Sequence, residues 1–328
     1  MFMKLRILYV RRASNHEWDE TWQTCDYATY FHSREWAEVW EKHSPESFRP
    51  EPRRVLFSDG NWAIVVLFRT GQRPDGLKEY MSSLHGTYGG WISRTPLSLR
   101  HRTLLTDYML KQCGNLYWRV NPYDENIFKV GVKKTSEETH AINLQTGFDT
   151  VRKQFSRGNI SSTQKARKLG VAVKVAEDLK DWRAYYGIYE DSLRRWGDKA
   201  SSRYEWELFE EFFRRRSQHI RLWLANVDET VVAGALCFYA KTHVVYWHGA
   251  TLESHFAYRP MNLLMAEIIR NSCEQGYSWF DFNPSGGHEG VKAFKLSFGV
   301  QALPCPVVCA AGQSQGWLNR LLVLVGKE

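Results

Sequence analysis

The sequence predicts an α/β fold made of two units that share one order of elements. The chain has 328 residues, which exceeds the roughly 100 to 200 residues of a usual domain. Strand and helix patterns alternate along it, and the segments FSDGNWAIVVLF and NVDETVVAGALCFY occupy equivalent places in the two halves. We therefore expect a duplicated α/β unit, each copy a mixed sheet flanked by helices, with domains at residues 1–146 and 147–313.

Local signals place the elements of the first half. Ser33 suits the start of a helix with a buried tryptophan face, and the Asp-Gly pair at 59–60 suits a tight turn between two apolar runs. Thr95 and Pro96 predict a second helix start, and Gly114 predicts its end. The predicted strands are residues 4–10, 54–57, 63–68 and 116–120.

The second half repeats this order after a polar stretch at residues 121–137. Ser202 and Glu205 form a capping-box pattern ahead of an apolar helix face, and Gly276 suits the end of a later helix at 263–273. The predicted strands are residues 220–226, 230–239, 244–247, 278–282 and 302–308. We expect the apolar stripe of residues 314–328 to form a helix that packs on the first domain, with a membrane surface as the alternative.

The charge balance favours an anionic partner. Lysine and arginine number 44 against 36 acidic residues, a formal net charge of +8. Such an excess suits phosphorylated ligands, nucleic acid or an anionic membrane surface, and it equally suits mere solubility. Basic residues gather at residues 152–168, 194–195 and 214–216, so the clusters carry more information than the total.

The cysteines and the apolar runs indicate a cytoplasmic protein. None of the six cysteines forms a Cys-x-x-Cys pair, so neither a disulfide framework nor a metal site is expected. Lys4 and Arg6 interrupt the first apolar run, and no later run is apolar enough to span a bilayer. We expect a cytoplasmic location, with peripheral contact at the inner membrane surface as an alternative.

A strand, a glycine-rich loop and a short basic helix follow one another in FDFNPSGGHEGVKAFKLSFG, residues 280–299. Ionisable groups crowd this segment among four phenylalanines. They are Asp281, His288, Glu289, Lys292 and Lys295. This grouping predicts the wall of a reaction cleft.

Three motifs resemble those of the FemAB-like aminoacyl and acyl transferases. They are SRGNISSTQKARKLGVAV from Ser156, YRPMNLLMAEIIRNSCEQGYSWFDFN from Tyr258 and AFKLSFG from Ala293. The resemblance implies two tandem domains of the acetyltransferase (GNAT) fold. It also implies transfer of an aminoacyl group from charged tRNA, or of another acyl group, onto an amine, as in the assembly of peptidoglycan in the cell wall.

One departure from the family pattern concerns the acceptor. Family members that act on cell-wall precursors resemble Gln-Ser-x-x-Trp-x-x-x-Lys in the first domain, where this chain reads HSREWAEVW at residues 32–40. Trp40 therefore replaces the lysine that meets the precursor's phosphates. This replacement disfavours a nucleotide-linked peptidoglycan acceptor.

The resemblance and the chemistry of acyl transfer together nominate the catalytic residues. Lys295 stands at the family's Phe-Lys position, where a cation would stabilise the tetrahedral oxyanion. Tyr246 occupies a strand position that lines the acceptor site in the family. The proton acceptor stays open among Asp281, His288, Glu289, Tyr246 and His248, and loss of the proton to the substrate itself needs no residue. Asp281 also suits a structural role, tying the loop backbone.

The expected donor site differs from that of ordinary acetyltransferases. Those enzymes hold the pyrophosphate of coenzyme A with a glycine-rich turn at a helix start, where this chain has Arg259, Pro260 and Asn262. Proline lacks the N–H group, so charged tRNA is favoured over acyl-CoA as donor. By the resemblance, the expected contacts to substrate phosphates and to the first domain's pocket are Arg157, Lys165, Lys168, Arg195 and Tyr88.

Three functions follow as hypotheses, and none calls for a permanently bound cofactor. The leading one is a FemAB-like N-acyltransferase that uses aminoacyl-tRNA or another acyl donor and a cell-envelope-related or small-molecule amine. The second is an N-acetyltransferase that depends on acyl-CoA. The third is a catalytically idle fold that serves as an RNA-binding or scaffold module, which the charge of +8 would suit.

Overall fold

The computed structural model describes residues 4–72, 76, 78–112, 115–124, 135–197, 200, 203–285 and 288–311. They divide into two compact units, one with residues up to Glu138 and from Pro304 on, the other spanning Thr139–Leu303. The boundary lies before residue 146 because strand β9 (Glu138–Asn143) pairs with β14 (Trp279–Asp281) of the second unit. The predicted helix at 314–328 lies outside the described residues.

The first unit contains two sheets. One has the strand order β1 (Ile7–Arg12), β3 (Arg53–Phe57), β4 (Trp62–Val66) and β7 (Gly90–Ile92). The other has the order β16 (Val307–Ala311), β8 (Asn115–Arg119), β6 (Lys78–Met81), β5 (Phe68–Gln72) and β2 (Arg49–Pro50). The expected tight turn joins β3 to β4, where Gly60 adopts a φ of 86° that favours glycine.

The helices of this unit are α1 (Asn15–Thr24), α2 (Arg34–His43) and α3 (Leu99–Gln112). The predicted start of α2 is confirmed, because the Ser33 hydroxyl accepts a hydrogen bond from the Trp36 N–H. The start predicted at Thr95 is wrong. The main chain enters α3 at Ser98, whose carbonyl accepts the Arg102 N–H. Gly114, its predicted end, lies outside the described residues.

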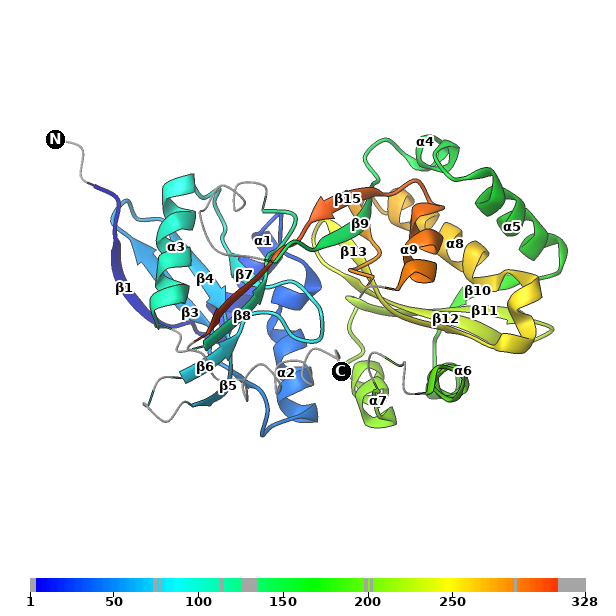
Figure 1. The fold of residues 1–328 in the computed structure, drawn as a ribbon, viewed down its shortest axis with the longest axis horizontal. Helices are drawn as coiled ribbons and strands as arrows, with labels where there is room; N and C mark the ends of the chain where they lie inside the picture. Colours follow the sequence, from blue (N-terminus) through cyan, green and yellow to red (C-terminus); the bar gives the residue numbers. More distant parts are fainter. Residues whose placement is uncertain are drawn as a thin grey trace. The chain divides into compact units, whose positions relative to one another are not determined.

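The second unit is built on one seven-stranded sheet. Its order is β10 (Ala172–Val175), β11 (Ile220–Val227), β12 (Thr230–Tyr239), β13 (His243–Thr251), β14, β9 and β15 (Gln301–Pro304). Figure 1 shows its helices in two layers. One face carries α4 (Phe148–Lys153), α5 (Arg157–Lys168), α8 (Pro260–Glu274) and α9 (Glu289–Leu296), and the other carries α6 (Leu179–Trp196) and α7 (Trp206–Arg214). Between β13 and α8 lies the 3₁₀ helix η4 (Glu253–Tyr258).

One capping prediction in this unit is wrong. Helix α7 begins at Trp206, and Glu205 is its N-cap residue without a side-chain cap bond. Glu205 therefore stands at the end of the preceding loop rather than in the first turn. Ser202, its expected partner, lies outside the described residues.

The two units repeat one strand–helix–strand arrangement. In the first unit the chain passes from β6 through α3 to β8, and β6 pairs with β8 in parallel. In the second it passes from β13 through α8 to β14, and those strands pair in parallel as well. An antiparallel strand from elsewhere in the sequence follows each time, β16 beside β8 and β9 beside β14. This correspondence supports duplication of one α/β unit.

Candidate functional site

The site is built where β13 and β14 stop pairing. Only His243–Val245 of β13 pair with β14, which ends at Asp281. Beyond Val245, β13 continues to Thr251 and pairs with β12 alone within the described ladders. The strands therefore diverge after Val245. The first residues beyond the shared ladder, Tyr246 and Phe282, have ring centroids 6.2 Å apart.

A strained residue follows β14. Asn283 has a φ of 61° and precedes Pro284, and both left-handed geometry and a following proline restrict a residue with a side chain. The buried Asp281 carboxylate accepts the Asn283 N–H at 2.7 Å and the Thr139 hydroxyl at 2.7 Å. The expected bond from Asp281 to the loop backbone is thus present. Asp281 holds the turn and does not face solvent.

Lys295 bonds the carbonyl of Asn283, the same residue whose N–H is bonded by Asp281. Its ammonium donates a hydrogen bond to the Asn283 carbonyl at 2.7 Å. Lys295 lies on the short helix α9, whose other residues are half-buried or exposed. The Lys295 residue is only 3% exposed. Burial lowers the pKa of Lys295 to about 8, and the negative charge of Asp281 opposes that shift in part. At neutral pH the group is therefore a desolvated cation at the end of β14.

The burial of Lys295 makes the stability of the fold depend on pH. Below pH 8 Lys295 is protonated in both the folded and the unfolded chain, so burying its charge destabilises the fold by up to about 3 kcal/mol. Between pH 8 and about 10.5 the folded chain binds fewer protons than the unfolded chain, so stability should rise with pH. We expect the unfolding free energy of the native protein, relative to Lys295→Met, to increase over that window in urea titrations. A constant difference would contradict a desolvated ammonium.

A bulge sends the two candidate side chains of β13 to opposite faces of the sheet. Tyr246 lies opposite Cys237 and His248 opposite Leu236, so Trp247 is the extra residue. Tyr246 packs into the core beneath α8, and its hydroxyl lies over Gly249, where an added Cβ would be 2.1 Å away. Burial raises the pKa of Tyr246, so its phenol keeps its proton.

His248 lies on the face covered by α6 and α7. Its Nδ1 is 2.6 Å from the Tyr185 hydroxyl, and aromatic rings of Tyr189 and Phe209 pack against it. Burial lowers the pKa of His248 to about 3 and raises the pKa of Tyr185 well above its usual value. The phenol of Tyr185 and the imidazole of His248 are therefore both neutral and share one hydrogen bond. A pKa this low makes His248 a poor proton acceptor at neutral pH, which disfavours it among the bases that the sequence left open.

The remaining predicted contacts lie at helix ends and exposed faces of the same unit. Arg195, at the end of α6, is half-buried, with its guanidinium 4.9 Å from the Phe256 ring centroid. His288 is exposed at the N-cap of α9, and Asn262 is half-buried in the first turn of α8. The other predicted cations are exposed: Arg157, Lys165 and Lys168 on α5, and Arg259 before α8. Within the described ranges, no hydrogen bond or ion pair joins these side chains to Lys295, whose ammonium bonds the Asn283 carbonyl.

Two positions of the first unit belong to its core instead of to a surface pocket. Tyr88 is fully buried, with its ring 6.1 Å from that of Phe31. Trp40 is 1% exposed and stacks on His85 with ring centroids 3.6 Å apart. The expectation that Tyr88 lines a ligand pocket is therefore corrected, because its side chain has no solvent-facing surface.

The start of α8 lacks the usual apparatus for a pyrophosphate. Arg259 adopts a φ of 58° as N-cap without a side-chain cap bond, and Pro260 follows at the first helical position. The Asn262 N–H donates to the Arg259 carbonyl, so a first-turn donor is already used. Fewer backbone N–H groups remain for an anion than at a glycine-rich turn.

Metal ions and membrane spans receive no support from the parts of the chain that are described. Across the described ranges no group of three or more His, Cys, Asp or Glu side chains is arranged to hold a metal ion. Within the same ranges, no helix combines the length and apolar character needed to cross a membrane.

Comparison with known proteins supports the fold. Residues 153–296 match the family model described as an acetyltransferase (GNAT) domain, and no curated protein sequence matches the chain. The crystal structure of FemX has a TM-score of 0.71 at 14% identity, covering 96% of this chain and all of that one. The C-terminal domain of a putative lysylphosphatidylglycerol synthetase from Agrobacterium fabrum gives 0.60 at 13% identity, with 95% and 98% covered.

A third structure, L-PGS from Bacillus licheniformis, gives a TM-score of 0.55 at 13% identity, covering 90% of this chain and 98% of that chain. At such identities these likenesses show the fold alone. The candidate site lies inside the matched range, since both Asp281 and Lys295 fall between residues 153 and 296. The chain thus has the fold of FemX over almost its whole length and carries an acetyltransferase (GNAT) domain that contains the candidate site.

Proposed function

We propose that this chain is an N-acyltransferase that moves an aminoacyl group from charged tRNA onto an amine of a cell-envelope-related or small-molecule acceptor. The observation that carries the proposal is the buried ammonium of Lys295, held 2.7 Å from the carbonyl of a strained residue at the point where β13 and β14 diverge. Strained residues fixed by buried charges are common where a fold is built for chemistry rather than for stability.

The reaction would use these groups as follows. The acceptor amine attacks the ester carbonyl, a C–N bond forms, and the carbonyl oxygen becomes an oxyanion that the Lys295 cation stabilises. The C–O ester bond then breaks, and the leaving ribose hydroxyl takes the proton that the amine loses. Tyr246 keeps its proton and serves as a hydrogen-bond donor, and Asp281 positions Asn283. No side chain has to act as base.

Charged tRNA is favoured as donor by two features. Pro260 and the bonded Asn262 N–H limit pyrophosphate binding at α8, and α5 presents exposed cations that suit an RNA backbone. One protein that shares the fold is named as a putative lysylphosphatidylglycerol synthetase, and this lipid is joined to lysine. We place the reaction in the cytoplasm, where charged tRNA is made.

An acyl-CoA donor is the second candidate, and the match to the acetyltransferase (GNAT) domain favours it. Native mass spectrometry against acyl-CoAs and a mixed pool of aminoacyl-tRNAs, at low and moderate salt, separates the two. We expect a complex with charged tRNA that weakens as salt rises. Stoichiometric binding of acyl-CoA alone would overturn the tRNA proposal. Binding of RNA without any transfer would support the idle RNA-binding module.

A further inference from the structure

The end of α9 is anchored on the junction between α4 and α5. The Ser156 N–H donates to the Ser297 carbonyl at 2.9 Å, and the Asn159 side-chain amide donates to the Ser297 hydroxyl at 2.7 Å. The chain leaves α9 through Gly299, which has a φ of 69° and where an added Cβ would lie 2.6 Å from the Gln154 carbonyl oxygen. The motif that begins at Ser156 and the motif AFKLSFG therefore meet at Ser297.

Asn159 lies at the centre of this anchor. Its residue is only 2% exposed. Besides the bond to Ser297, its side-chain oxygen accepts the Thr163 hydroxyl at 3.2 Å, and its N–H donates to the Ser156 hydroxyl at 3.1 Å. An amide can donate and accept at the same time, so one buried side chain links α5 to itself and to the end of α9.

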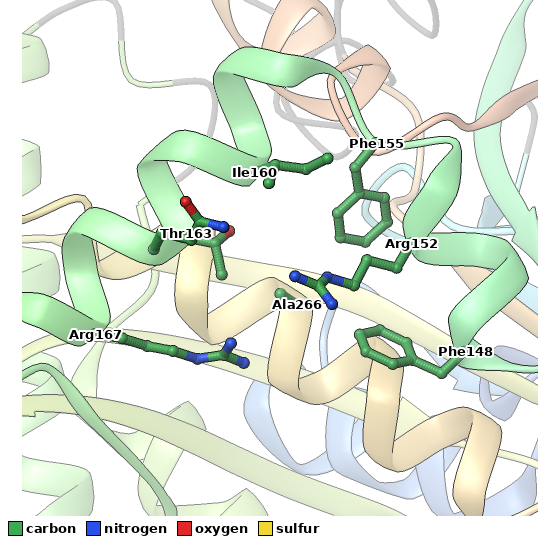
Figure 2. Close-up of a pocket in the computed structure, with 8 residues that line it drawn as sticks. Phe148, Arg152, Phe155, Ile160, Thr163, Arg167 and Ala266 are labelled. Atoms are coloured by element: carbon green, nitrogen blue, oxygen red, sulfur yellow. The ribbon is translucent and has the colours of Figure 1, made fainter.

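Aromatic packing joins the same two segments. Figure 2 shows Phe155 and Ile160 on the side of the junction that faces α8, where both line a small hollow. The ring centroid of Phe155 lies 5.2 Å from that of Phe298, which follows Ser297. The Phe298 ring in turn lies 5.3 Å from that of Phe282, directly after β14. The junction, the end of α9 and the end of β14 thus pack together.

The position of α9 depends on such contacts because the helix is short. It has eight residues, and helices of fewer than about 12 residues are not stable by themselves in water. Among those eight residues only Lys295 is buried. Lys295 lies in the last turn, two residues before Ser297. What holds Ser297 therefore also decides where the Lys295 ammonium lies.

We propose that Asn159 positions Lys295 for acyl transfer: by holding Ser297 it fixes the last turn of α9, and so keeps the ammonium at the Asn283 carbonyl. The part that Lys295 takes in transfer rests on the proposed function. The place of its ammonium does not, because it can be measured without any transfer. Asn159 itself acts through Lys295 and has no contact with the reacting groups in this scheme.

NMR titration of the lysine ¹³Cε signals tests the position of the ammonium. The signal of Lys295 is identified by its loss in Lys295→Gln. In the native protein burial lowers the pKa of Lys295 to about 8. In Asn159→Ala we expect this pKa to rise toward its ordinary value of about 10.4, because a loosened last turn admits water. Ser297→Ala should raise it as well, and the double variant should add little to either single change.

Gln164→Ala is the matched control, since it removes an exposed amide side chain from the same helix. We expect it to keep the native pKa of Lys295 and the native kcat. In single-turnover and steady-state transfer assays, Asn159→Ala should lower kcat about tenfold and keep KM for the donor within about threefold, because the donor's own contacts are unchanged.

Several outcomes would overturn the inference. If Asn159→Ala is less stable in urea but keeps the native pKa of Lys295 and the native kcat, Asn159 is only a structural residue. If Gln164→Ala raises the pKa equally, the effect does not pass through Ser297. If Asn159→Ala does not fold, a native pKa in Ser297→Ala refutes the inference. If the native protein transfers nothing while Asn159→Ala still raises the pKa, the proposed function fails and the positioning of the ammonium stands.

Discussion

Replacing Lys295 by glutamine should lower kcat/KM for acyl transfer by 10² to 10³, with donor affinity held within about tenfold. The ammonium is a buried cation at the point where β13 and β14 diverge, and the loss of a donor aimed at a developing oxyanion typically removes about 3 to 4 kcal/mol of transition-state stabilisation. Glutamine can still donate to the Asn283 carbonyl, so the turn should survive. Single-turnover transfer from the donor found by native mass spectrometry is the measurement.

Lys292→Gln is the matched control, because it removes a lysine from the same helix three residues earlier. Lys292 is half-buried, whereas Lys295 is 3% exposed, and we expect the Lys292 variant to stay within about threefold of native kcat/KM. Equal losses in both variants would assign the effect to the charge of α9. Unchanged turnover in Lys295→Gln would leave Lys295 as a structural group that supports Asn283. If neither the native protein nor either variant transfers an acyl group, the binding-module hypothesis is favoured.

The parts of the fold that short-range signals determine are predictable from the sequence. The Ser33 cap and the Asp-Gly turn at 59–60 depend on residues close in the chain, and both are observed. The predicted start of α3 and the capping box before α7 were wrong: the Ser98 hydroxyl accepts the His101 N–H at the start of α3, and Glu205 is the N-cap residue of α7 without a side-chain cap bond. Strand β9 was not predicted at all, because its partner β14 lies more than 130 residues away in the sequence.

The candidate site also has residues with a local sequence signal and residues without one. Lys295 and Asp281 could be found because they lie together in one short segment with a recognisable motif. Thr139, which bonds Asp281 across 142 residues, and Tyr185, which bonds His248 across 63, could not be found. No local pattern marks them, because a hydroxyl on a strand or helix is ordinary until the fold brings it to its partner. Asn283 was the one missed residue with a local signal, since asparagine tolerates left-handed geometry.

Gly234→Ala should destabilise the second unit by about 2 to 3 kcal/mol. A Cβ at Gly234, on β12, would lie 2.3 Å and 2.6 Å from ring carbons of Tyr185 and 3.2 Å from Leu224. Tyr185 is fully buried and packs edge-on against Phe209, so its ring cannot move away without opening the core. Urea unfolding measures the loss, and the ring ¹⁵N shifts of His248 should show that the bond from the Tyr185 hydroxyl is weakened.

Gly187→Ala is the matched control, and we expect it to raise the stability rather than lower it. Gly187 lies in α6 two residues from Tyr185, it is exposed, and an added Cβ there meets no atom within 4 Å. Alanine in a helix interior is favoured over glycine by about 0.5 to 1 kcal/mol, so this variant should be slightly more stable than the native protein. If both variants lose stability equally, the effect is not contact with Tyr185. If Gly234→Ala alone loses stability and also shifts the His248 resonances, the closeness of β12 to the Tyr185 ring is what fixes the histidine.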